Sequence, residues 1–183
     1  FAKSANDRDN VCWIRYVSKE DIKEQARLYC DKIRKKFVIL TPEEWVRQNS
    51  IELLTIDKKY PIGRFGNEIK LNINGMPKRC DSIFYDENAN PILIIEYKAP
   101  TVKITKEVFA QISRYNLTLR VDYLIISNCL QHYCWKMNYE KQSFTFLQEI
   151  PTYDTILDAE KKDKLIATTN PEKKDLAIEL EWV

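Results

Sequence analysis

Three residues, Asp81, Glu96 and Lys98, have types and spacing that could carry out chemistry. Asp81 lies early in an alternating segment, and Glu96 ends a continuous apolar run. Lys98 follows Glu96 by two residues, so both side chains lie on the same face of a strand. Two neighbouring carboxylates repel each other and raise the pKa of one of them. A divalent cation between them removes that repulsion, so the set indicates a metal site.

A hairpin would bring the two carboxylates together. If its turn is centred on the middle of residues 87–90, Phe84 pairs with Leu93. The same register pairs Asp81 with Glu96, with Cβ atoms about 5 Å apart. Paired hard oxygen ligands favour Mg²⁺, for which we expect Mn²⁺ to substitute. The metal would polarise a phosphodiester and activate water, and the lysine would orient that water or offset charge. The alternative is a solvated salt bridge at a strand end.

The elements that must position these residues are expected in the order helix, three strands, helix, strand. The first helix is capped by Thr41, begins at Pro42 and runs to about residue 54. The other expected elements are strands at 69–74, 79–86, 92–97 and 121–127, a helix at 104–119, and a hairpin of 132–137 with 143–148. This order predicts an α/β fold of three layers with a mixed central sheet.

Further elements are expected outside this core. Residues 19–36 have the spacing of a charged helix, with Ile22, Ala26, Tyr29 and Ile33 on one face. A short extended piece follows at 37–40. The segment 155–183 is expected to form two charged helical pieces interrupted at Asn170-Pro171.

The combined motifs resemble the PD-(D/E)xK nuclease superfamily. The carriers are Asp81-x₁₄-Glu96-Tyr97-Lys98 and Gln111-x₃-Tyr115. With Thr41–Gln48 and Ser127-Asn128, the chain is similar to the N-terminal domain of type I restriction enzyme R subunits, including short stand-alone relatives, over roughly residues 33–150. The resemblance implies a restriction-endonuclease-like αβββαβ core of three α/β/α layers and metal-dependent DNA cleavage. It predicts a nuclease-like domain at 33–150, an N-terminal extension at 1–32 and a helical C-terminal extension at 151–183.

The resemblance also implies residue roles. Asp81 and Glu96 become metal ligands, with the Tyr97 backbone carbonyl and Glu44 as further ligands. Lys98 becomes the catalytic lysine beside the acidic residues. Gln111 and Tyr115 are implied to position the site or the nucleic-acid backbone. Apart from the resemblance, Arg47 and Arg114 would point near the site if the helices pack as supposed, and could contact phosphates. Cys80 stands where the family has proline, a change that leaves the ligand untouched.

Some of these residues have simpler explanations. Glu44 is three residues after Thr41, so its carboxylate could close a capping box instead of binding metal. Glu43 is then the alternative acid. Glu68 could support the site or be a solvated strand end. The arginines could be ordinary surface cations.

Composition excludes several classes of function. A net charge of +2 is not that of a polycation, so DNA contact must come from a local basic patch. With three glycines and no G-x-x-x-x-G-K-[ST], the sequence encodes no ATPase phosphate loop. Five dispersed cysteines are expected to be reduced thiols of a cytoplasmic protein, and no apolar run is long enough for a membrane span. Zinc is not expected, because Cys129, His132 and Cys134 lack a fourth ligand at suitable spacing.

Three functions remain open on the sequence. The first is an active Mg²⁺-dependent DNA endonuclease of restriction or defence type. The second is a DNA-binding or assembly module that awaits a motor or other restriction-complex subunits. The third is a structural protein whose acidic strand end is incidental. Because one site cuts one strand, cleavage of both strands is expected to need at least transient homodimers.

Overall fold

The structure, a computed structural model, describes residues 11–12 and 28–158 of the chain. Its helices are α1 (Pro42–Glu52), the π-helical turn η1 (Leu53–Asp57), the 3₁₀ turn η2 (Ile62–Arg64), α2 (Lys106–Leu119) and α3 (Tyr153–Leu157). Its strands are β1 (Val11–Cys12), β2 (Leu28–Asp31), β3 (Lys36–Ile39), β4 (Phe65–Ile73), β5 (Met76–Tyr85), β6 (Pro91–Tyr97), β7 (Tyr123–Ser127), β8 (His132–Asn138) and β9 (Ser143–Leu147). In the ranges described, no helix is long and apolar enough to cross a membrane.

The main sheet has six strands in the order β4-β5-β6-β7-β8-β9. Strands β6 and β7 are parallel and are joined through α2, while the other neighbours are antiparallel, so the predicted mixed sheet is confirmed. The predicted hairpin register is also confirmed, because Phe84 pairs with Leu93. That register continues to Ser82 and Ile95, one position before Asp81 and Glu96. The order helix, three strands, helix, strand is therefore the order of the core.

Helix α1 begins where the sequence predicts. The Thr41 hydroxyl accepts a hydrogen bond from the Glu44 N–H at 3.1 Å, and Pro42 is the first helical residue. This satisfies one of the free N–H groups of the first turn. The reciprocal bond of a capping box is not formed, because the Thr41 N–H donates to the Ile39 carbonyl. The carboxylate of Glu44 is thus not used as the cap.

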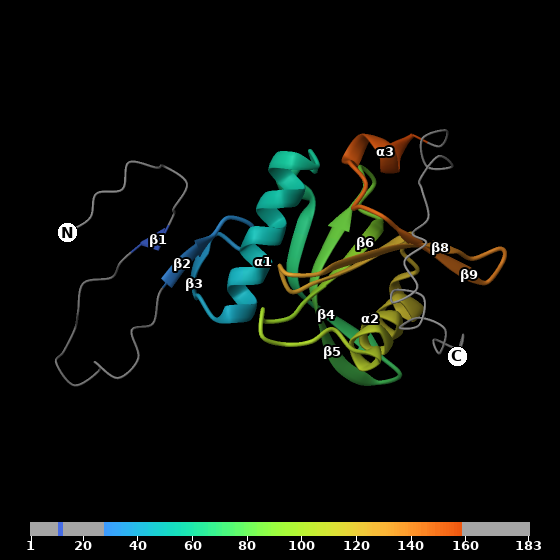
Figure 1. The fold of residues 1–183 in the computed structure, drawn as a ribbon, viewed down its shortest axis with the longest axis horizontal. Coiled ribbons are helices and arrows are strands. Elements are labelled where there is room, and N and C mark those ends of the chain that lie inside the picture. Colours follow the sequence, from blue (N-terminus) through green and yellow to red (C-terminus); the bar gives the residue numbers. More distant parts are fainter. Residues whose placement is uncertain (1–10, 13–27, 159–183) are drawn as a thin grey trace.

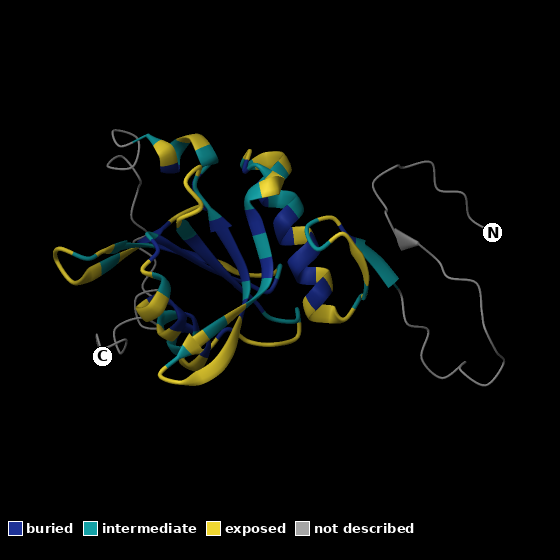
Figure 2. Cartoon of the chain, turned by 180° about the vertical axis from the view of Figure 1, so that it is seen from behind, coloured by how far each residue is buried: buried dark blue, intermediate teal, exposed yellow. Residues whose placement is uncertain are grey.

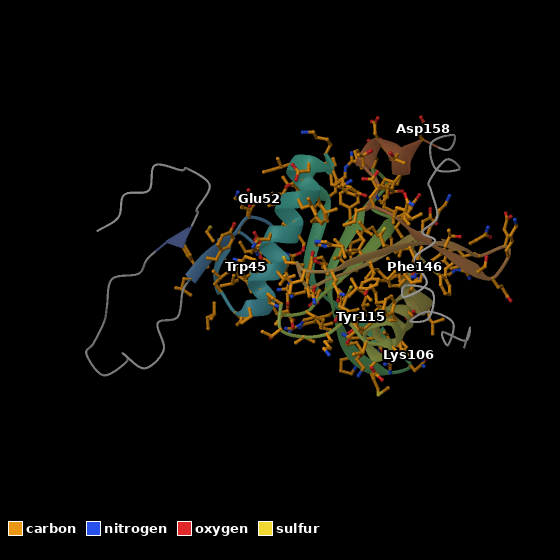
Figure 3. The ribbon with its side chains drawn as sticks, in the orientation of Figure 1. Trp45, Glu52, Lys106, Tyr115, Phe146 and Asp158 are labelled. Atoms are coloured by element: carbon orange, nitrogen blue, oxygen red, sulfur yellow. The ribbon has the colours of Figure 1, made fainter. Side chains whose placement is uncertain are left out.

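The sheet carries one apolar core on each face. Helix α2 covers one of them through Val108, Phe109 and Ile112, and we call it the α2-side core. Helix α1 covers the other through Val46, with Leu54 of η1, and we call it the α1-side core. In β6, Ile94 belongs to the first core and Ile95 to the second, as expected for a strand buried on both faces. Figure 1 and Figure 3 show the two helices on either side of the strands, and Figure 2 shows the central strands as buried.

Strand β4 changes face at Glu68. Phe65 packs in the α1-side core, yet Ile69, four residues later, packs against the α2-side core. A regular strand would keep both on one face. Glu68 adopts φ +60° between the pairs Asn67–Ser82 and Ile69–Cys80, so it lies across from Asp81. The left-handed conformation of Glu68 thus coincides with the point where the side chains of β4 change faces of the sheet. This point lies beside the candidate carboxylates.

The helix expected over residues 19–36 is wrong for its described part. Residues 28–31 form β2 and 36–39 form β3, an antiparallel pair in a small sheet with β1. The turn between them is built by Asp31, whose Oδ1 accepts the N–H groups of Ile33 at 2.7 Å and Arg34 at 2.9 Å. Lys35 then adopts φ +50°. Side chain-to-backbone bonds of this kind compete with helix formation. The expected extended piece after residue 36 is confirmed as β3.

The remaining expectations concern the C-terminal part. The predicted helix at 104–119 is α2, and the predicted hairpin is β8 with β9. Of the C-terminal helical extension, α3 ends at Leu157, and residues 159–183 lie outside the described residues. Residues 1–10 and 19–27 also lie outside them.

Candidate active site

Asp81 and Glu96 lie together where β5 and β6 meet, with α1 on one side and α2 on the other. One Asp81 oxygen accepts the Tyr97 N–H at 2.9 Å, which fixes Asp81 against the end of β6. The other oxygen accepts Arg47 Nη2 of α1 at 2.8 Å. The negative charge of Asp81 raises the pKa of Glu96, as expected for two carboxylates in one site.

Glu96 is the most deeply buried of these acids, with 2% of the residue exposed. Its Oε1 accepts hydrogen bonds from Lys98 Nζ at 2.8 Å and from Gln111 Nε2. Its Oε2 is buried and has no hydrogen-bond partner among the described residues. Burial and then the charge of Asp81 raise the pKa of Glu96 to about 7, while Lys98 lowers it. A buried acceptor without a partner is uncommon, so this oxygen has the capacity to accept a further donor or a cation.

Lys98 supplies the positive charge of the site. Burial opposes its charge, but the hydrogen bond and charge of Glu96, together with Asp81, outweigh burial and raise the pKa of the ammonium. The ammonium also donates to Gln111 Oε1, at 3.4 Å. Lys98 is therefore a cation and a hydrogen-bond donor at neutral pH, and not a base.

Gln111 and Tyr115 lie on one face of α2, as their four-residue spacing predicts. The Gln111 amide nitrogen donates to Glu96 and also to the Tyr115 hydroxyl, the latter at 3.0 Å. Tyr115 is buried against the α2-side core. Helix α2 thus positions the Gln111 amide, which donates to Glu96 through its nitrogen and accepts from Lys98 through its oxygen.

Arg47 is a buried link between three acidic residues. Its residue is 3% exposed, and its guanidinium pairs with Glu44, with Glu68 at 2.8 Å and with Asp81 at 2.8 Å. The ring of Tyr97 also lies beneath it, 5.6 Å from Cζ to the ring centroid. This planar, multidentate use is characteristic of arginine. Arg47 therefore supports the site, and its guanidinium is already paired with the three carboxylates.

The two adjacent acids of α1 have different surroundings. Both Glu44 oxygens are engaged, Oε1 by Arg34 and Gln48 and Oε2 by Arg47. Glu43 is exposed, and its pKa is raised by partial burial and then by Asp81, with Lys98 acting in the opposite direction. Glu43 therefore interacts electrostatically with Asp81, whereas the Glu44 carboxylate is paired with Arg34 and Arg47.

Sequence reasoning missed a buried polar network behind the site. Asp31, 0% exposed, pairs with Arg34 and accepts a bond from Asn67 Nδ2 at 3.3 Å. Ser82 donates to Asn67 Oδ1 at 2.6 Å. The spacing of Asp31 and Arg34 was consistent with an ordinary helix ion pair, so it gave no signal of this role.

Two other candidates, Arg114 and Glu68, have different surroundings. Arg114 is exposed, and its Nε donates to the Ala110 carbonyl of its own helix at 3.1 Å. Glu68 lies inside β4 and not before it, and it pairs with Arg47 and Arg79. Its position across from Asp81 makes it part of the site's surroundings and not a solvated strand end.

The residues fit a hard divalent cation, although in the described part no three His, Cys, Asp or Glu side chains form a ready-made metal cluster. Asp81 and Glu96 supply carboxylate oxygens in one site, and Glu96 Oε2 lacks any partner there. Oxygen donors in a small set suit Mg²⁺, which completes its shell with water.

Comparisons with known proteins agree with the motifs. The family model described as type I restriction enzyme R protein N terminus matches residues 42–151. No curated protein matches. Among solved structures, a fragment assigned as an HsdR subunit of a type I restriction enzyme from Vibrio vulnificus YJ016 is similar, with 13% sequence identity and a TM-score of 0.46. That match covers 67% of this chain and 25% of the Vibrio chain, so this chain spans about a quarter of its length. The chain belongs to the family of type I restriction enzyme R protein N-terminal domains.

Proposed function

We propose that this domain is a Mg²⁺-dependent DNA endonuclease of a restriction system, with a restriction-endonuclease-like core of three α/β/α layers. The observation that carries the proposal is Glu96. It presents a buried oxygen without a partner beside Asp81, while its other oxygen holds Lys98. Membership of the R-protein family supports the restriction role.

Asp81 and Glu96 are the proposed metal ligands, with the Tyr97 backbone carbonyl as a third. Of the two acids of α1, we assign Glu43 to the site, because the bonds of Glu44 to Arg34 and Arg47 compete with the metal role expected for it. A divalent cation held there supplies Lewis-acid polarisation of a phosphodiester and a more acidic water.

The chain's own residues then act on the phosphodiester in defined ways. Lys98 keeps its proton, so its ammonium donates to an attacking water or to the phosphoryl oxygens, where negative charge grows in the transition state. Gln111 holds that ammonium in place, and Tyr115 holds Gln111. Arg47 of α1 donates a hydrogen bond to Asp81 and so fixes the position of its carboxylate.

Titration of Mn²⁺ or Mg²⁺ into the protein, run beside a plasmid cleavage assay, tests the proposal. We expect Asp81→Ala to remove both binding and cleavage, because it deletes one of the two carboxylates. The control is Asp57→Ala, an exposed acid at the C-terminal end of η1, which should change neither. In the same titration Glu43→Gln should weaken metal binding, and Glu44→Gln should leave it nearly unchanged.

The outcomes separate the candidate functions. Metal binding that depends on Asp81 without cleavage would favour a DNA-binding or assembly module that awaits a motor partner. Metal binding that survives Asp81→Ala would refute the proposed site. The absence of any binding would support a purely structural protein.

A further inference from the structure

Two exposed cations face each other just beyond Asp81 on the β4–β5 hairpin. Lys70 of β4 pairs directly with Arg79 of β5, so their side chains lie on the same face of the sheet. Their Cβ atoms are expected to be about 5 Å apart, and like charges directly opposite each other are destabilising. Both residues are exposed, in the part of the hairpin that Figure 2 shows as exposed. Glu68 pairs with one of the two cations, Arg79, so the charge of Lys70 is the one that this carboxylate does not directly offset.

A strained residue holds one of these cations. Glu68 adopts φ +60°, a left-handed backbone conformation that residues other than glycine rarely adopt. Its two oxygens hold Arg47 at 2.8 Å and Arg79 Nε at 2.6 Å. Arg79 nevertheless has a side chain that is 65% exposed. The Glu68 carboxylate thus lies between Arg47, which also pairs with Asp81, and Arg79, which precedes Asp81 by two residues.

The direction of the hairpin relates this pair to the carboxylates. Arg79 precedes Asp81 by two residues on the same strand, a separation of about 7 Å along the strand axis. The face change at Glu68 puts Lys70 and Arg79 on the side opposite Ile69 and Leu71, which pack on the α2-side core. The cations therefore lie on the α1 side of the hairpin, next to the candidate site and clear of the core.

We propose that Lys70 and Arg79 bind one backbone phosphate of duplex DNA, next to the phosphodiester presented to Asp81 and Glu96. The inference rests on the proposed function and identifies how its substrate is seated. The guanidinium recognises phosphate oxygens through several donors, and the ammonium adds a point charge. Glu68 orients Arg79 without removing it from solvent. The contact reads the backbone and not the sequence.

The test is the salt dependence of binding to a fluorescent duplex oligonucleotide, in EDTA so that no cleavage occurs. Loss of one phosphate contact lowers the slope of log K against log salt by about 0.9. We expect Lys70→Gln with Arg79→Gln to weaken binding at least fivefold near 0.1 M salt and to lower the slope by that amount. The matched control is Lys141→Gln, an exposed lysine in the β8–β9 turn, which should change neither quantity.

Thermal unfolding and the Mn²⁺ titration accompany each variant, and the double variant should remain folded and bind Mn²⁺ like the parent. If the folded double variant keeps the parent's affinity and slope, the phosphate site is refuted. An equal loss in Lys141→Gln would also refute it, because the effect would then be one of net charge. Failure of the proposed function is seen separately, as the absence of Asp81-dependent Mn²⁺ binding.

Discussion

At the scale of single residues, the chemistry of the candidate site follows from what each carboxylate contacts. Glu96 is buried, and one of its oxygens has no hydrogen-bond partner among the described residues. Asp81 accepts hydrogen bonds from Arg47 and from the Tyr97 N–H. Glu44 is bonded to arginine side chains, among them Arg47. The three carboxylates therefore have different roles, although the sequence pattern alone gave all three the role of metal ligand. The raised pKa of Glu96 links the site to pH near neutrality.

Metal affinity should fall as pH falls below about 7. Burial and the charge of Asp81 raise the pKa of Glu96 to about 7, so in acid the metal must displace a proton. For one competing proton, affinity is expected to fall about tenfold per pH unit below that pKa. Mn²⁺ titrations at pH 5.5, 6.5 and 7.5, in two buffers of different ionisation enthalpy, measure the affinity and the proton released. A constant affinity over this range would contradict the prediction.

The same pKa affects folding in the metal-free protein. An unfolded Glu96 ionises near its ordinary value of 4.5, while the folded residue keeps its proton to about 7. Between these values the folded state binds more protons, so stability from this group falls as pH rises through the window and is constant above it. A metal ion bound at the proposed site would oppose this effect, because it would compensate the charge of Glu96.

At the scale of elements, the β4–β5 hairpin matters most, because its change of face sets where Glu68, Arg79 and Asp81 lie. The crossing is tightly packed. A Cβ added at Gly66 would lie 2.8 Å from Ile69 Cδ1 and 3.3 Å from Tyr85 Cε2. Ile69 leans back over Gly66 as it moves to the α2-side core. The glycine thus leaves room for the side chain that follows the face change.

Gly66→Ala should therefore destabilise the fold, by about 1 kcal/mol, since the end of Ile69 can shift but Tyr85 also resists. Gly63→Ala is the matched control, because a Cβ there meets no atom within 4 Å. It should be neutral or stabilising by less than about 1 kcal/mol. Urea unfolding of both variants measures the difference. Equal stability of the two would show that the crossing is not tightly packed.

At the scale of the whole molecule, the described residues carry one candidate site, formed around Asp81 and Glu96. If the proposed endonuclease activity holds, a single site of this kind cuts one strand at a time. A second copy, related by symmetry, is the simplest way to cut the other strand. The action of the isolated domain on a closed plasmid therefore depends on how often two copies meet.

If the proposed function holds, nicked circles should appear first, and linear DNA should increase more steeply than in proportion to protein concentration. The physical reason is that linearisation needs two chains at nearby positions. A plasmid time course over a range of concentrations, with Asp81→Ala as the inactive control, measures both products. Linear DNA that appears without nicked intermediates at low concentration would contradict this expectation.

The sequence by itself determined the features that arise from local chemistry. The Thr41 cap and Pro42 start α1, and the register of Phe84 with Leu93 aligns β5 with β6. Periodicity also predicted α2 and the buried strand that ends in Glu96. Turn geometry and apolar alternation act over a few residues, so they can be read without knowing the rest of the fold.

Only the tertiary structure decided which side chains from distant segments form ion pairs and hydrogen bonds with one another. The expected helix gave way to β2 and β3, and the buried Asp31 between them accepts a hydrogen bond from Asn67 of β4, 36 residues along the chain. The engagement of Glu44 by Arg34, the bridging of Arg47, and the left-handed Glu68 depend on segments ten or more residues apart. Ion pairs and hydrogen bonds between distant segments leave no periodic pattern in the sequence. They form only when folding brings their partners within about 3 Å of one another.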